Sequence, residues 1–160
     1  MIRVNPWRFY RSSCLNRQVK LRIAWIGKTK EPAIQSLTDE YLKRLSRYTD
    51  VQGMALRDES AVLKLGADRH RLVLLDSRGK EFSSEEFAAF LRNHQDRNPL
   101  PLLFGVGPAN GFTEETRQEA NLLLSLGKMT VAHELARVVL LEQLYRALTI
   151  LTGHPYHLGH

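Results

Sequence analysis

The chain has 160 residues, of which 43% are hydrophobic and 25% are charged, and its formal net charge is +6. This length and composition fit one globular domain with a core, and no apolar run is long enough to span a membrane. A single cysteine, Cys14, excludes an internal disulfide bond and is typical of a reducing cytosol, so we expect a cytoplasmic protein.

The positive charge is concentrated at the start of the chain. Residues 1–19 carry four arginines and no acidic residue, and the rest of the chain has 19 basic and 17 acidic side chains. This near balance makes basicity weak support for nucleic-acid binding. We interpret residues 1–19 as a basic extension before a single domain at 20–160. A start codon assigned too early, with Val19 as initiator, is favoured over a phosphate-contacting arm or an amphipathic targeting peptide.

From residue 20 onward, short apolar runs alternate with segments of helical periodicity. Strands are predicted at 21–26, 51–56, 71–76, 101–104 and 129–131. Helices are predicted from Pro32, over 58–66, after a cap at Ser83 or Ser84, from Thr113 to about Leu124, and over 134–151. This alternation indicates an α/β fold whose parallel sheet is covered by helices on both faces.

Ligands of open parallel sheets bind beyond the carboxyl ends of the strands. This rule selects three segments, which are 76–80, 105–112 and 126–133. The second segment contains three glycines, which permit positive φ angles and close approach of a ligand. It lacks the spacing of the dinucleotide fingerprint, and no Gly-Lys-Ser/Thr closes it as in a P-loop. The sequence of this segment therefore supports a ligand-binding loop and a plain strand-to-helix turn equally well.

The last third of the chain carries several polar candidates. Histidines stand at positions 154, 157 and 160, but no carboxylate accompanies them, so no metal site is predicted. Contact with RNA explains this histidine- and tyrosine-containing tail better, because such rings stack on unpaired bases. Glu142 precedes Arg146 by four residues, and an ion pair is the default interpretation. His133 is equally a helix-start packing residue or a catalytic one.

Several segments carry a resemblance to a known family. They read KLRIAWIGKTKEPAIQSLTDEYLKRLSRY, VLLDSRGKEFSSEEFAAFL, LLFGVGPANGF, LSLGKMTVAHELARVVLLEQLYRALTI and HPYH. On these segments, residues 20–160 resemble the large-subunit ribosomal RNA methyltransferase H family of the SPOUT superfamily. The stretch from Leu124 to His157 is the most specific part, because its motifs occur there in the family's order.

The resemblance implies a homodimeric methyltransferase with a C-terminal trefoil knot and no metal. It implies that a methyl group moves from S-adenosylmethionine to nitrogen 3 of a pseudouridine in the large-subunit ribosomal RNA of assembled ribosomes. Carried over by position, backbone atoms of three loops would hold the cofactor, at Leu75, Gly107, Gly127, Lys128, Met129, Thr130, Val131 and Ala132. These loops coincide with the segments that the strand-end rule selects.

Such a reaction mainly requires alignment of donor carbon and acceptor nitrogen and removal of one proton. Candidates for orienting or deprotonating the base are His133, Tyr156 and His157. Candidates for contacts with RNA are Arg137, Arg146 and His154. We expect the tail to order over the cofactor pocket, with little effect on folding, and the apolar last helix to form a two-fold dimer.

The chain also departs from the family pattern. The glycine loop is longer than usual, and Gly127, Ala132 and Leu158 replace the usual serine, proline and basic residue. The region between the second and third strands is shorter. Two alternative functions therefore stay open, which are a catalytically silent ribosome- or RNA-binding paralogue and a nucleotide or phosphate-ester enzyme that uses the glycine loop.

Overall fold

The protein is built on one parallel sheet. The computed structural model describes residues 18–67 and 69–159, so Cys14 and nearly all of the basic extension lie outside the described residues. The strands are β1 (Leu21–Ile26), β2 (Val51–Leu56), β3 (Arg71–Glu81), β4 (Leu102–Val106) and β5 (Leu122–Ser125). They pair in the order β2-β1-β4-β3-β5, and every pair is parallel, as predicted. The carboxyl ends of all strands therefore meet at one edge.

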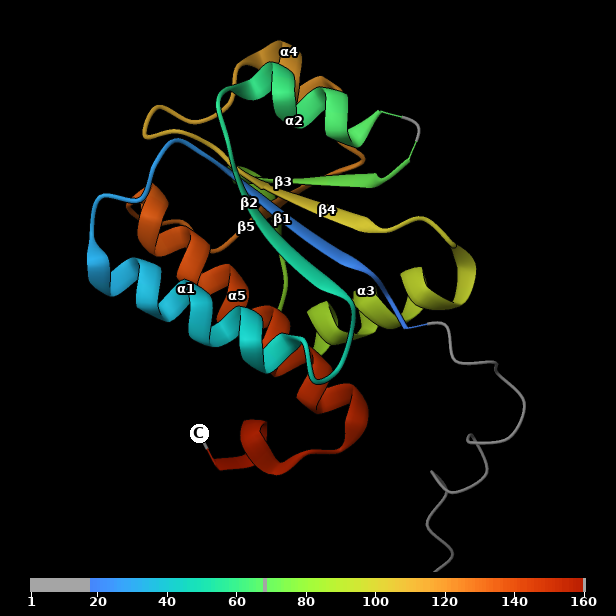
Figure 1. Cartoon of the computed structure of the whole chain (residues 1–160). Helices are drawn as coiled ribbons and strands as arrows, with labels where there is room; N and C mark the ends of the chain where they lie inside the picture. Colours follow the sequence, from blue (N-terminus) through green and yellow to red (C-terminus); the bar gives the residue numbers. More distant parts are fainter. Residues whose placement is uncertain (1–17, 68, 160) are drawn as a thin grey trace, which may run out of the picture.

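Helices cover both faces of this sheet, which confirms the predicted fold class. They are α1 (Pro32–Leu45), α2 (Glu59–Gly66), α3 (Ser84–Arg97), α4 (Glu114–Gln118) and α5 (His133–Thr152), followed by a 3-10 helix at Pro155–Gly159. Figure 1 shows α1, α3 and α5 on one face and α2 with α4 on the other. Local signals set the helix starts: proline opens α1, and Ser83 forms a capping box with Glu86 before α3.

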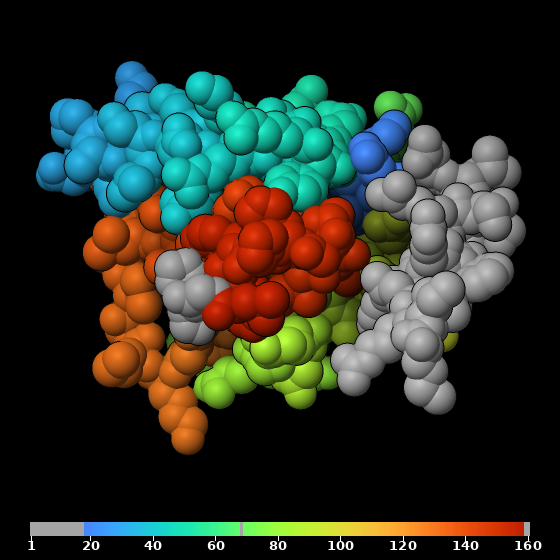
Figure 2. All heavy atoms as spheres, turned by 90° about the horizontal axis from the view of Figure 1, so that it is seen from below, coloured from blue at the N-terminus to red at the C-terminus, as the bar shows by residue number. Residues whose placement is uncertain are grey.

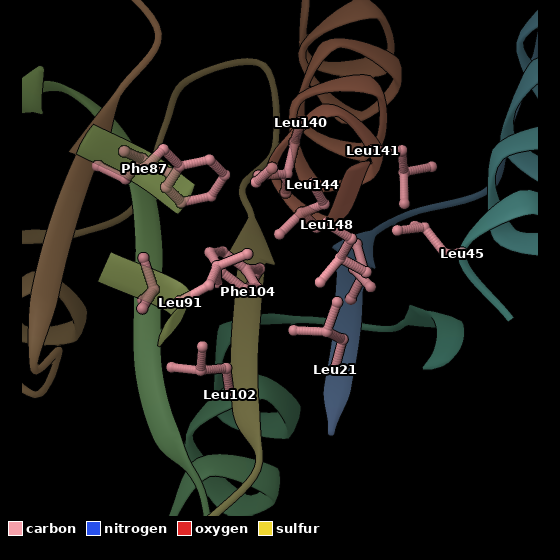
Figure 3. Close-up of a cluster of buried hydrophobic side chains, with 14 of the residues drawn as sticks. Leu21, Leu45, Phe87, Leu91, Leu102, Phe104, Leu140, Leu141, Leu144 and Leu148 are labelled. Carbon is pink, nitrogen blue, oxygen red and sulfur yellow. The ribbon is translucent and has the colours of Figure 1, made fainter. Parts of the chain in front are cut away.

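Helix α5 supplies the centre of the larger core. Four of its leucines are buried against the sheet, where Leu21 of β1 and Phe104 of β4 meet them (Figure 3); they are Leu140, Leu141, Leu144 and Leu148. Each such side chain stabilises the fold by about 1.5–3 kcal/mol relative to exposure. Neither α5 nor any other helix among the described residues is long and apolar enough to cross a membrane.

Strand β3 extends beyond the predicted end at Asp76 and reaches Glu81. After a register shift it resumes pairing with β5 at Lys80. A Cβ atom at Gly79 would lie 2.5 Å from the carbonyl carbon of Leu123, so this close approach of two backbones requires glycine. The second half of β3 is polar and mostly exposed, and for that reason an apolar-run criterion missed it.

The predicted helix over 113–124 and the predicted strand over 129–131 are both wrong. Thr113 caps a helix as predicted, but this helix is short, and the apolar run after it is strand β5. The side chain of Asn121 accepts a hydrogen bond from the backbone N–H of Leu72 and fixes the entry into β5. Short apolar runs are ambiguous between helix and strand, and here the ladder with β3 decides. Residues 129–131 form an exposed loop.

The packed domain begins one residue earlier than the predicted boundary at residue 20. Val19 is buried in the larger core. Its carbonyl oxygen accepts a hydrogen bond from Thr49 Oγ1, which anchors the segment that leads into β1.

Candidate active site

A cavity of about 510 Å³ opens at the carboxyl end of β4, beside the middle of β3. Its walls come from the middle of β3, the loop after β4 and the loop between β5 and α5, and we call it the strand-end cavity. These are the three segments that the strand-end rule selected from the sequence. The volume lies within the roughly 300–1,000 Å³ usual for small-molecule sites.

Most residues predicted to hold a cofactor line the strand-end cavity. Seven of the eight do so, and they are Leu75, Gly107, Gly127, Met129, Thr130, Val131 and Ala132. Lys128 belongs to the same loop but is not among the lining residues. His133, the first residue of α5, also lines the cavity. Residues selected from the sequence thus lie around one cavity, and its walls carry many small residues that leave backbone atoms accessible.

The glycines in and beside the cavity wall differ in their roles. Gly105 lies inside β4 and does not line the cavity, whereas Gly111 lines it and, at a φ of 75°, adopts the left-handed conformation predicted for this loop. A Cβ atom at Gly107 would lie 3.1 Å from the ring of the buried Phe112, so a side chain there has little room. Gly127, at a φ of 137°, is held by Ser125, whose Oγ donates to the Gly127 carbonyl and accepts from its N–H.

A charged cluster forms one wall of the cavity. The side chain of Asp76 is 8% exposed, and its Oδ1 accepts a 2.8 Å hydrogen bond from the backbone N–H of Arg78. Arg117 lies 3.5 Å from Asp76 Oδ2 and donates to the carbonyl oxygen of Phe112 and to Glu114 Oε2, at 2.6 and 2.5 Å. Arg117 thus ties the glycine loop to β3. The strand-end rule included Asp76 in the 76–80 segment, but the sequence did not indicate its pairing with Arg117, because that pairing depends on the fold.

Arg137, predicted to contact RNA, is enclosed. It is 1% exposed, and its guanidinium carbon lies 4.2 Å from the centre of the Trp25 ring. Its Nη2 donates to Thr29 Oγ1 at 2.8 Å, and burial lowers the pKa of the guanidinium. An enclosed guanidinium does not fit the predicted contact with a phosphate. Arg137 instead ties α5 to the loop after β1.

The tail, residues 154–159, lies at the other end of α5. Gly153 ends the helix at a φ of 74°, and the 3-10 helix then packs on the second half of α5. Figure 2 shows the tail (red) between α1 (blue to cyan) and the β3–α3 segment (yellow-green). Helix α5 has 20 residues and is about 30 Å long, and the strand-end cavity lies at its first turn. Within one subunit, the tail therefore does not lie over the strand-end cavity, whereas the sequence predicts that it lies over the cofactor pocket.

Side chains of the tail and of α5 form a connected network. Tyr156 Oη donates to Glu142 Oε1 at 3.1 Å, and its ring lies 4.8 Å from the ring of Tyr145 in an edge-to-face arrangement. The predicted ion pair between Glu142 and Arg146 is confirmed at 2.6 Å, and the Arg146 guanidinium lies 5.0 Å from the centre of the Tyr156 ring. The tail therefore packs specifically, and these contacts favour a larger loss of stability on its removal than the sequence suggested.

The remaining tail residues extend this network to α3. His157 Nδ1 lies 3.2 Å from Arg146 Nη1, and Nε2 lies 2.8 Å from Glu85 Oε1. His154 is exposed. Across residues 18–67 and 69–159, no group of three His, Cys, Asp or Glu side chains is arranged to hold a metal ion.

The pKa of Tyr156 bears on its predicted role. Burial, followed by hydrogen bonding to Tyr41 and the nearby Glu142 carboxylate, raises the pKa of the Tyr156 phenol to about 12. The phenol is then protonated at neutral pH and cannot act as the base that removes a proton. It retains the capacity to orient a neighbouring group.

Exposed apolar side chains cluster where the chain enters α5. Met129, Val131, Leu135 and Val139 are exposed by 85%, 40%, 51% and 40%, and we call them the apolar strip. The other apolar residues of α5 are buried or partly buried within the subunit, so Leu135 and Val139 are the exposed large apolar side chains of this helix. Isolated exposed apolar residues are ordinary, but a contiguous group is typical of an interaction surface.

Comparisons with known proteins identify relatives over most of the chain. The profile of the family described as predicted SPOUT methyltransferase matches residues 19–157. The chain is 58% identical over 146 residues to the ribosomal RNA large subunit methyltransferase H of Koribacter versatilis, which covers 89% of this chain and 100% of the relative. It is 40% identical over 152 residues to the protein of the same name from Geotalea daltonii, covering 87% and 99% of the two chains.

Solved structures with low sequence identity share the fold. A probable methyltransferase from Bordetella pertussis superposes with a TM-score of 0.58 at 12% identity, over 81% of this chain and 95% of the other. The SpoU methyltransferase AviRb from Streptomyces viridochromogenes, solved in complex with the cofactor AdoMet, gives a TM-score of 0.50 at 13% identity, over 81% and 58% of the chains.

Proposed function

The chain belongs to the ribosomal RNA large subunit methyltransferase H family of SPOUT methyltransferases, and on that premise we propose that it methylates nitrogen 3 of a pseudouridine in large-subunit ribosomal RNA with S-adenosylmethionine. The family implies the trefoil knot and an enzyme of the cytoplasm that acts on assembled ribosomes. The observation that carries the proposal is the convergence of Leu75, Gly107 and the 127–132 loop on one cavity.

The strand-end cavity fits S-adenosylmethionine in size and in chemistry. Its volume of about 510 Å³ accommodates a cofactor of this size, and the small residues of its walls expose backbone donors and acceptors for an adenine ring. Asp76, nearly enclosed in the wall, places a carboxylate where a ligand with a sulfonium and an ammonium group is expected. The cofactor supplies an activated methyl group, and we expect micromolar affinity without a divalent metal.

The residues of the chain have few tasks in this reaction. The loops orient the methyl donor, and the cavity excludes water from it. The imide of pseudouridine loses the proton on nitrogen 3 as this nitrogen takes the methyl group, so a nearby acceptor assists. His133 lines the strand-end cavity at the start of α5, and we assign this role to an imidazole nitrogen of His133.

A two-fold dimer would give the tail access to a strand-end cavity. Within one subunit the tail lies at the wrong end of α5, as described above. The apolar strip lies beside the cavity, and residues such as Leu135 are exposed in the single subunit. We propose that two copies pack through this strip and α5, so that the tail of one subunit, with Tyr156 and His157, reaches the cavity of the other. Arg146 and His154 would then face the RNA.

The test is methyl transfer from labelled S-adenosylmethionine to ribosomes from a strain that lacks this gene. The proposal predicts label on one pseudouridine of the large-subunit RNA, with the methyl group on nitrogen 3 by mass spectrometry of the nucleosides. Calorimetric titration distinguishes the alternatives. Binding of nucleotides instead of S-adenosylmethionine would indicate a nucleotide enzyme, and binding of ribosomes without any small molecule would indicate a silent paralogue.

A further inference from the structure

A second cavity, of about 340 Å³, lies at the start of α3. It shares Leu124, Leu126 and Gly127 with the strand-end cavity, so the two spaces adjoin. Phe82 and Phe87 contribute apolar surface to its wall. We call it the α3 cavity. A flat ring held there would lie next to a methyl donor in the strand-end cavity.

The polar groups of the α3 cavity are mostly occupied by the backbone. Ser83 Oγ accepts from the N–H of Glu86 as the cap of α3, and Ser125 Oγ bonds both backbone groups of Gly127. Ser84 and Gln143 are different, because they bond other side chains. Glu81 also lines the cavity but is exposed, so Ser84 and Gln143 are the polar side chains of the cavity that bonds to other side chains hold in place.

Two hydrogen bonds fix the amide of Gln143. Ser84 Oγ donates to Gln143 Oε1 at 2.9 Å, and Gln143 Nε2 donates to Glu142 Oε2 at 2.9 Å. Together they set which way the amide faces. A carbonyl oxygen has two acceptor positions, so Oε1 keeps one after bonding Ser84. The α3 cavity therefore contains an oriented acceptor that the fold itself does not saturate.

Pseudouridine differs from uridine in one group that such an acceptor recognises. Its sugar is attached to carbon 5, which leaves an N1–H donor that uridine lacks. Nitrogen 3 has to face the methyl donor in order to be methylated, so the ring edge that carries N1 faces away from it. A fixed acceptor on the side away from the strand-end cavity meets N1–H in pseudouridine and a C–H group in uridine.

Building on the proposed function, we infer that the α3 cavity holds the target base and that Gln143 Oε1 accepts a hydrogen bond from N1–H, which selects pseudouridine over uridine. Phe82 and Phe87 supply the apolar contact for the ring, and Leu124 and Gly127 border the cofactor. With uridine, Gln143 Oε1 keeps only its bond from Ser84 and meets a C–H group, so the hydrogen bond that pseudouridine gains is absent. Gln143 is thus a specificity residue, separate from the residues that hold the cofactor.

The test compares two ribosome substrates. Both come from strains that lack this gene, and one strain also lacks the synthase that makes the target pseudouridine. Gln143→Leu keeps the approximate size of the side chain and removes the acceptor. We expect kcat/KM on pseudouridine to fall about tenfold or more and kcat/KM on uridine to stay unchanged, so that the preference shrinks by the same factor. Gln143→Glu keeps an acceptor oxygen but loses the donor to Glu142, so it should retain more of the preference than Gln143→Leu and less than the wild type.

The outcomes separate this inference from the proposed function. Affinity for S-adenosylmethionine and the melting temperature check that Gln143→Leu folds, and Ser84→Ala, which only loosens the amide, should lower the preference by a smaller factor. Equal losses on both substrates, or an unchanged preference in both variants, would overturn the role of Gln143 and leave the methyltransferase intact. A wild-type protein that binds the cofactor and methylates neither ribosome would overturn the proposed function, and this inference with it.

Discussion

The two ends of α5 are built in different ways. At its first turn the strand-end cavity is formed by loops whose small residues expose the backbone, and many of the side chains there are small or exposed. At its last turns Glu142, Arg146, Tyr156 and His157 bond one another through their side chains. A site made of backbone depends on open space rather than on particular side chains, and a side-chain network depends on the groups that bond one another. This explains how Gly127 and Ala132 can depart from the family pattern without loss of the cavity.

Removal of residues 156–160 tests the tail and should have the largest effect. We expect methyl transfer to fall by about 1,000-fold, because the tail is a site element in the proposed dimer, while affinity for S-adenosylmethionine changes little. The lost Tyr156 contacts to Tyr145 and Glu142 are worth about 2–3 kcal/mol, which should lower the melting temperature by about 5–10 °C. Normal turnover in single-turnover methylation would reduce the tail to a packing element.

Gly107→Val tests the strand-end cavity at the first turn of α5. The new side chain has little room beside Phe112, and it narrows the strand-end cavity. We expect affinity for S-adenosylmethionine to fall by at least about 100-fold, with a small drop in melting temperature because Phe112 has to move. Gly66→Ala is the matched control, since its Cβ would meet neighbours at an ordinary 3.6 Å. Unchanged calorimetric binding in Gly107→Val would place the cofactor elsewhere.

Leu135→Asp tests whether the strand-end cavity of one subunit and the tail of the other meet in a dimer. A charge on the apolar strip would have to be desolvated at the interface, so we expect the dimer to dissociate about tenfold to 100-fold more readily. Sedimentation across a concentration series measures this shift. Leu100→Asp, at a similarly exposed leucine before β4, should leave the association unchanged. A wild-type protein that is monomeric at micromolar concentration would remove the basis for a shared site.

Tyr156→Phe gives the smallest effect and sharpens the description of the tail network. Loss of the hydrogen bond to Glu142 should lower the free energy of unfolding by about 1 kcal/mol at pH 7. The folded-state pKa of about 12 exceeds the ordinary value of 10.0, so the contribution of the phenol is complete below pH 10 and is lost as the pH rises toward 12. The difference between wild type and variant should therefore shrink between pH 10 and 12 in denaturant titrations, and a constant difference would contradict the assignment.

Local signals in the sequence were sufficient for most of the fold. Apolar runs identified β1, β2 and β4, and proline and serine caps placed the starts of α1 and α3. Strand β5 and the second half of β3 were missed because they are defined by pairing with each other across a register shift. No local pattern of apolar residues encodes that pairing.

In the candidate site, too, the features that are local in sequence could be predicted and the others could not. The three loops of the strand-end cavity follow from strand ends and from the family motifs, which are local in sequence. The tail network is not local in sequence, since His157 bonds Glu85, which lies 72 residues earlier. The charged cluster of the strand-end cavity is not local either, since Asp76 and Arg117 are 41 residues apart. Spacing correctly indicated the pair of Glu142 and Arg146, because four residues bring side chains together on one helix face. It could not indicate that the tail packs against the second half of α5 and contacts Glu85 of α3.

Complementation between two inactive variants tests most directly whether both ends of α5 serve one reaction. Gly107→Val subunits keep an intact tail, and subunits that lack residues 156–160 keep an intact strand-end cavity. Co-expressed with different tags and purified through both, they form mixed dimers with one complete site of two. The account predicts that these mixed dimers recover about half of the wild-type methyl transfer to ribosomes, while each variant alone stays inactive. Mixed dimers that are folded, bind S-adenosylmethionine and remain inactive would contradict it.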